Sequence, residues 1–214
     1  MNRYGKSLLL ATAVIVAGGI HIAPAQAVTL LTLESPGSAV YQQTQNSPCV
    51  IGDPSCNQPA GFPSTTVPAN TDPITNLGSP VYTVGQITSL VGNTFFVGID
   101  VNQAGPSGIF LDSFRLDIAG VTQFSYTGGA QLQVLNNGNG FSDALLKGFN
   151  LSGFAAGSTA QFFVTYHNQT DGREEFFLIA SNAPRVVPEP ASLILLGSGL
   201  AGIGLWGVKR RKSS

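Results

Sequence analysis

Ser113-Phe114-Arg115-Leu116-Asp117-Ile118 alternates polar and apolar side chains at every step. In a β-strand successive side chains point to opposite faces, so this period of two predicts a strand with one buried face. The side chains of Phe114, Leu116 and Ile118 would then lie in the core. The stretch lies near the middle of the chain and indicates β structure for the region around it.

Short runs of the same kind recur on both sides of this stretch, separated by turn sequences such as Gly128-Gly129 and Gly157-Ser158. Such spacing is typical of a sandwich of antiparallel strands. The expected strands are residues 28–33, 39–43, 81–88, 94–101, 113–118, 121–126, 131–135, 161–167 and 174–180. We therefore predict an all-β fold, an antiparallel β-sandwich of jelly-roll or immunoglobulin-like arrangement, with no helix inside it.

The first 27 of the 214 residues have the three-part form of a secretory signal peptide. Arg3 and Lys6 precede a mostly apolar run over residues 8–20, and Ala25-Gln26-Ala27 follows as a small-x-small cleavage site. The run is too short for a comfortable membrane span. We therefore expect residues 1–27 to direct export and to be removed after recognition of Ala25 and Ala27.

Near the other end, residues 191–208 form an uncharged stretch just long enough to span a bilayer. Four cations follow it directly, and such a cluster holds its end of a span in the cytoplasm. These cations are Lys209, Arg210, Arg211 and Lys212. The pattern predicts a transmembrane helix over residues 191–208.

Pro188-Glu189-Pro190 stands just before this span, and its prolines favour an extended, accessible backbone. A Pro-Glu-Pro motif, an apolar helix and a terminal basic cluster over residues 188–214 together resemble the PEP-CTERM sorting signal of Gram-negative bacteria. The resemblance implies that an exosortase, a transpeptidase-like membrane enzyme, processes the tail in a bacterium that makes extracellular polysaccharide. Pro188, Glu189 and Pro190 would then be recognition elements of a substrate. A permanent single-span anchor is the alternative.

Residues 28–187, between the two ends, form the expected exported domain. The region from residue 28 to residue 190 has eleven acidic residues but only four basic ones, Arg115, Lys147, Arg173 and Arg185. Nucleic-acid binding requires clustered cations, so this charge balance argues against it.

Within this domain, residues 44–80 hold seven of the 13 prolines, and we expect them to form a long exposed loop. Cys49 and Cys56 lie in this loop. Paired cysteines in an exported chain predict a local disulfide, because the loop offers neither a second cysteine pair nor an adjacent histidine for a metal.

Few residues of this domain suggest chemistry. His167 is its only histidine, and without a Gly-x-Ser-x-Gly motif it is expected to be a polar residue at a strand end. Asp100 and Asn102 have the opening spacing of a calcium loop, but Ala104 and Leu111 occupy later ligand positions. An EF-hand is therefore rejected, and only a weak candidate for a looser Ca²⁺ site is left. We expect no cofactor and no other metal.

Acid–base catalysis by a pair of carboxylates is a further possibility for glycan chemistry. Glu174 and Glu175 would point to opposite faces of a strand and so make a poor pair. Four other carboxylates could supply such a pair, but no spacing singles one out, and we expect no enzyme. These are Asp100, Asp112, Asp117 and Asp143.

Aromatic side chains in the predicted strands could include a platform for sugar stacking, although most should be core. The candidates are Phe95, Phe96, Tyr126, Phe162, Phe163, Tyr166, Phe176 and Phe177. The sequence thus favours an exported, non-catalytic surface or matrix protein associated with exopolysaccharide or biofilm. A carbohydrate-binding β-sandwich module and a permanently anchored envelope protein are the alternatives.

Overall fold

The computed structural model describes residues 27–34, 41–103, 108–135 and 140–185. The expected signal peptide is represented only by Ala27, and the expected transmembrane helix over residues 191–208 lies outside the described residues. Within the part that is described, no helix is both long and apolar enough to cross a bilayer.

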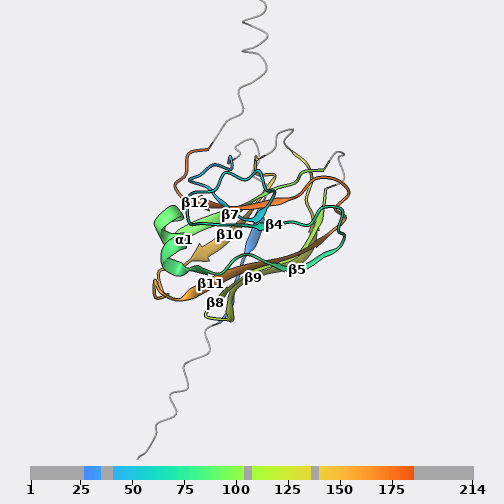
Figure 1. The fold of residues 1–214 in the computed structure, drawn as a ribbon. Coiled ribbons are helices and arrows are strands. Elements are labelled where there is room, and N and C mark those ends of the chain that lie inside the picture. The colour runs from blue at the N-terminus through green and yellow to red at the C-terminus, as the bar shows by residue number, and fades with distance from the viewer. Residues whose placement is uncertain (1–26, 35–40, 104–107, 136–139, 186–214) are drawn as a thin grey trace, which may run out of the picture.

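Two six-stranded sheets pack face to face, as Figure 1 shows. Sheet A has the order β1-β9-β8-β11-β5, with β6 also paired to β11, and sheet B has the order β2-β10-β7-β12-β3-β4. The strands are β1 (Thr29–Leu30), β2 (Thr32–Glu34), β3 (Cys49–Gly52), β4 (Thr65–Thr66), β5 (Ile74–Gly78), β6 (Tyr82–Thr83), β7 (Thr94–Asp100), β8 (Phe110–Ile118), β9 (Val121–Gln131), β10 (Ala144–Asn150), β11 (Thr159–His167) and β12 (Glu175–Ala180). The predicted β-sandwich is confirmed.

Most of the strand pairs are antiparallel, as predicted, but both sheets are mixed. β1 runs parallel to β9, and β4 runs parallel to β3. Both parallel pairs lie at an edge of their sheet, so the central strands keep the predicted antiparallel arrangement.

β8 contains the alternating stretch that predicted the fold. Phe114, Leu116 and Ile118 are at most 3% exposed and lie in the main core between the sheets. β8 pairs with β9 on one side and β11 on the other, so its apolar face lies near the middle of the sandwich. The prediction for this stretch is confirmed.

A helix, α1 (Val84–Val91), replaces most of the strand predicted over residues 81–88. Thr83 caps it: Thr83 Oγ1 accepts a hydrogen bond from Gln86 N at 3.1 Å, and Gln86 Oε1 accepts one from Thr83 N at 2.8 Å. This capping box is readable from Thr83 and Gln86 three residues apart. Val84, Ile87 and Val91 are buried on one side of α1, a helical spacing that a search for period two overlooks.

Residues 44–80 are not the single long loop that their prolines predicted, because β3, β4 and β5 lie among them. All four residues of β3 are buried. β10 was also missed, since Lys147 and Gly148 interrupt its apolar pattern. Residues 131–135 form no separate strand: β9 ends at Gln131 and the chain continues without strand pairing.

The strand predicted over residues 28–33 divides between the two sheets. β1 pairs with β9 in sheet A, and β2 pairs with β10 in sheet B. Leu31 lies between them and is buried in the core. The N-terminal segment thus connects the edges of both sheets on one side of the sandwich. Residues 41–43 of the predicted strand 39–43 contribute only an isolated bridge, between Gln42 and Phe141.

The outer face of sheet B is covered by the chain itself. A second apolar cluster lies there, on the side away from the main core, and the segments on either side of β3, residues 41–48 and 53–57, contribute to it; we call these two segments the cover. A side chain at Gly98 would collide with the ring of Phe177, so this glycine lets the ring approach β7 closely. The cluster consists of Tyr41, Cys49, Cys56, Leu145, Phe177 and Ile179, with Phe96 and Ala183 packed against it.

Candidate functional site

The disulfide predicted between Cys49 and Cys56 is present, with the two Cα atoms 6.1 Å apart. It joins β3 to the cover, where Gln43 holds the loop by accepting a hydrogen bond from Asn57 N at 3.0 Å. Cys49 is fully buried and Cys56 is 9% exposed. The carboxylate oxygen Glu175 Oε2 lies 4.0 Å from Cys49 Sγ, a contact that the sequence analysis did not foresee.

Four carboxyl groups are buried where β7, β10 and β12 meet, each in a residue at most 3% exposed: Asp100, Asp143, Glu174 and Glu175. Burial, together with repulsion from Glu175 and Asp143, raises the pKa of Asp100 to about 8. Burial likewise raises the pKa of Glu174 and of Glu175 to about 7 in each case.

Backbone and side-chain donors hold several of these carboxyl groups. Asp143 accepts hydrogen bonds from Val101 N at 2.8 Å and from Leu135 N at 2.7 Å. Glu174 accepts one from Asn102 N at 2.6 Å and another from the Gln103 side chain. These bonds fasten the chain segments that follow β7 and precede β10, so Asp143 and Glu174 have clear structural roles.

The geometry adds little support for the weak Ca²⁺ candidate formed by Asp100 and Asn102, because both side chains are engaged by other groups. Asp100 accepts a hydrogen bond from Gly140 N, whereas the Asn102 amide donates to Arg173 O at 2.9 Å. In the described ranges, the one cluster of three metal-type ligand atoms is Cys49, Cys56 and Glu175. Its two sulfur atoms are bonded to each other, so they offer no thiolate to a metal.

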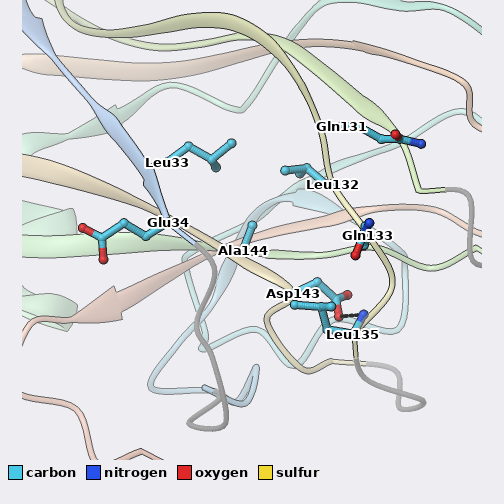
Figure 2. Close-up of a pocket in the computed structure, with 8 residues that line it drawn as sticks. All are labelled: Leu33, Glu34, Gln131, Leu132, Gln133, Leu135, Asp143 and Ala144. Atoms are coloured by element: carbon cyan, nitrogen blue, oxygen red, sulfur yellow. Dashed lines mark hydrogen bonds between the residues drawn. The ribbon is translucent and has the colours of Figure 1, made fainter.

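A pocket of about 230 Å³ opens between β2 and the end of β9, and Asp143 lies in its wall (Figure 2). Its lining is half polar and half apolar by residue, with Glu34, Gln131, Gln133 and Asp143 supplying the polar groups. The dashed line in Figure 2 is the bond from Leu135 N to Asp143. Because this carboxyl group is already engaged by two backbone donors, it is poorly placed as a catalytic base. The lining residues are Leu33, Glu34, Gln131, Leu132, Gln133, Leu135, Asp143 and Ala144.

His167 is the last residue of β11, the strand-end position that the sequence predicted. Its Nδ1 lies 2.9 Å from Asp112 Oδ2, and its ring stacks on Phe110 with centroids 4.9 Å apart. A histidine oriented by a carboxylate supplies two of the three members of a catalytic triad, but a triad also needs a hydroxyl or thiol on the other nitrogen. Among the described residues, the hydrogen bond of this ring is the one to Asp112.

The four carboxylates considered for glycan hydrolysis do not form one site. Asp112 and Asp117 belong to β8 of sheet A, whereas Asp100 and Asp143 are buried at sheet B. Glu174 and Glu175 contact different groups, as their predicted opposite directions require.

The aromatic candidates are mostly core, as expected. Phe95, Phe162, Tyr166, Phe176 and Phe177 are fully buried, and the three half-buried rings are Phe96, Tyr126 and Phe163.

Phe163 lies on the outer face of sheet A with the Arg115 guanidinium 4.0 Å from its ring centroid. Arg115 also donates to Asn76 at 2.7 Å and to Asp117 at 3.3 Å, and Asp117 accepts from Thr122 Oγ1 at 2.7 Å. These side chains come from four neighbouring strands, β5, β8, β9 and β11. They form a polar surface with one half-buried ring, which we call the Arg115 surface.

The recognition residues of the tail, Pro188, Glu189 and Pro190, lie outside the described residues, as do Ala25 and Lys209–Lys212. Ala27 is described, and it is exposed two residues before β1. Residues 186–212 match the family model of the PEP-CTERM protein-sorting motif. The tail carries a PEP-CTERM motif.

This match covers the Pro-Glu-Pro tripeptide and the basic cluster on which the resemblance rested. It marks the chain as an exported exosortase substrate that the tail holds transiently in the membrane before delivery to the surface or the exterior. No curated protein and no solved structure matches the chain. The β-sandwich must therefore be interpreted from its own residues.

Proposed function

We propose that this protein is a non-catalytic surface or matrix component that associates with the extracellular polysaccharide of the cell that exports it. The observation that carries the proposal is the PEP-CTERM motif at residues 186–212, which fits delivery to the cell surface. The function is then exercised by the β-sandwich.

A non-catalytic role is supported by the way the candidate groups are used. His167 and Asp112 pair with each other, Asp143 is held by two backbone donors, and Asp100 accepts from Gly140 N. Glycoside hydrolysis needs two carboxyl groups facing one sugar bond, about 5–10 Å apart. The carboxylates of β8 and those buried at sheet B lie on different sheets. Hydrolysis of a polysaccharide that is abolished by one substitution in the sandwich would refute this role.

Polysaccharide association is supported by the Arg115 surface. Sugars are recognised by planar side chains and by hydrogen bonds to hydroxyl groups. The Arg115 surface provides the Arg115 guanidinium on Phe163, together with the side chains of Asn76, Asp117 and Thr122. Arg115 is 31% exposed, so a ligand can reach it.

The first experiment is the intact mass of the protein recovered from membrane and extracellular fractions of the cells that make it. We expect the extracellular form to begin after Ala27 and to lack the residues that follow Pro188–Pro190. A protein found only in the membrane and still ending at Ser214 would contradict processing and favour the permanent anchor.

The second experiment measures retention of the released protein in gels containing the exopolysaccharide of the same cells. Arg115→Ala should abolish the retention. Lys147→Ala is the matched control, because Lys147 also lies over a ring, 5.3 Å from the Phe96 centroid, but on sheet B. Equal retention of the wild type and of Arg115→Ala would exclude the Arg115 surface as the binding site.

A further inference from the structure

The Cys49–Cys56 disulfide has a buried carboxyl group as a neighbour. Glu175 is the first residue of β12 and points to the outer face of sheet B, where its Oε2 lies 4.0 Å from Cys49 Sγ. Gly52 leaves room for this approach, since a Cβ there would lie 2.8 Å from Cys56 Sγ and 3.4 Å from Glu175 Cγ. A disulfide sulfur carries no proton, so it can act only as a weak acceptor toward a protonated Glu175.

The two cysteines differ in their exposure to solvent. Cys56 is 9% exposed, whereas Cys49 is fully buried. An incoming thiolate therefore reaches Cys56 first, and Cys49 becomes the leaving group. A thiolate at Cys49 would form in a dry site, where an unpaired charge is costly. The carboxyl group of Glu175 is the acid next to it.

The charges around Glu175 favour its protonated form. Asp100 on β7 is its Cα partner across the sheet, and Asp53 approaches from the cover. Arg173, the nearby cation, pairs instead with Asp53 at 3.2 Å. Burial and Asp53 raise the pKa of Glu175 to about 7, so the group can give or take a proton near neutral pH.

We propose that Glu175 carries the proton that Cys49 exchanges when the Cys49–Cys56 bond is made or broken by a dithiol partner. The disulfide loop is then a site of thiol–disulfide exchange as well as a structural crosslink. The partner is a molecule with a dithiol–disulfide pair in the compartment to which the protein is exported. It reacts with the protein at Cys56.

In the opening direction, a thiolate of the dithiol attacks Cys56 Sγ and forms a mixed disulfide. The Cys49–Cys56 bond breaks, its electron pair leaves on Cys49 Sγ, and that sulfur takes the proton of Glu175. The second thiol of the partner, as its thiolate, then displaces Cys56 as a thiolate, so the dithiol is oxidised by two electrons and the protein is reduced by two. In closing, the Glu175 carboxylate takes the proton of Cys49, whose thiolate attacks the mixed disulfide at Cys56.

The test follows reduction of the released, folded protein by dithiothreitol, with free thiols counted by alkylation and mass. Each rate is divided by the concentration of dithiothreitol thiolate. In the wild type this corrected rate should fall as pH rises through neutrality and Glu175 ionises. In Glu175→Gln it should be lower at pH 6 by about 10²-fold and independent of pH, because general acid catalysis is lost.

Glu174→Gln is the matched control, because Glu174 is equally buried and adjacent but is bonded to Asn102 and Gln103. It should keep the wild-type rate and pH profile. A folded Glu175→Gln with the wild-type rate and profile would overturn the proposal.

If Glu175→Gln does not fold, Glu175→Asp decides the question, since it keeps the acid but moves it away from the sulfur. A slower corrected rate that still falls with pH supports proton transfer. An unchanged rate refutes it.

Discussion

The two outer faces of the sandwich differ sharply in chemistry. On sheet A, β8 and β11 turn Arg115, Asp117 and Gln161 outward, and the half-buried Phe163 lies among them. On sheet B, β12 turns Phe177 and Ile179 outward beneath the cover, where both are fully buried. The outer face of sheet A is thus open to solvent, whereas the outer face of sheet B is closed by a third layer of chain that a disulfide holds in place.

The largest expected effect is the response of stability to pH, which should originate at the covered face. The pKa values of Asp100, Glu174 and Glu175 are raised by burial to about 8, 7 and 7. Between about pH 4 and pH 8 the folded chain therefore binds more protons at these groups than the unfolded chain does, and the free energy of unfolding falls as pH rises. The fall should amount to several kcal/mol, since one pKa unit corresponds to about 1.4 kcal/mol.

Urea titrations at a series of pH values measure this slope. Asp100→Asn should reduce the slope, although Glu174 and Glu175 still contribute to it, whereas Asp117→Asn, on the open face, should leave the slope unchanged. A flat profile for the wild type would show that these carboxyl groups are better solvated than their burial indicates.

The next effect compares one phenylalanine on each outer face. Phe177→Ala should lower the free energy of unfolding by about 3–5 kcal/mol, because the emptied space lies between β7 and the cover. Phe163→Ala should cost about 1 kcal/mol, since its ring is only half buried and its main partner is Arg115. Chemical denaturation of the two variants, with the disulfide intact, measures the difference. Similar losses for both would mean that the cover adds little to the stability of sheet B.

The smallest effect concerns the disulfide itself. Replacing both Cys49 and Cys56 with serine opens a short loop, for which loop-closure entropy predicts a loss of about 2–3 kcal/mol. The cover should loosen first, so amide exchange should increase around Tyr41 and Gln43 before it increases in β8. Uniform acceleration of exchange across both sheets would contradict this local role.

The same comparison explains which parts of the fold could be predicted from sequence. β8 has one solvent-facing and one buried face, so the alternation of polar and apolar side chains can be recognised in the sequence. β12 has apolar side chains on both faces, so its sequence does not indicate which face contacts the main core and which contacts the cover. β3 lies among prolines, so its sequence was interpreted as part of a loop. α1 was missed because its apolar spacing was taken for a strand, although its capping box is present in the sequence.

Predictions for the candidate sites divide in the same way. A disulfide between two cysteines seven positions apart, and a sorting tail with its motif, depend on short local sequence. The proximity of Glu175 to Cys49 joins residues 126 positions apart, through the pairing of β12 with β3. No local pattern encodes such a contact, and it appears only when the register of the sheet is known.

The described chain ends on one particular side of the sandwich. Ala183 packs into the cluster under the cover, and Arg185 Nε donates to the Tyr41 hydroxyl at 3.3 Å. The chain thus leaves the domain on the side of sheet B, whereas β1 begins on sheet A (Figure 1). A tether through the tail would therefore start on the covered side of the sandwich, the side opposite to the Arg115 surface.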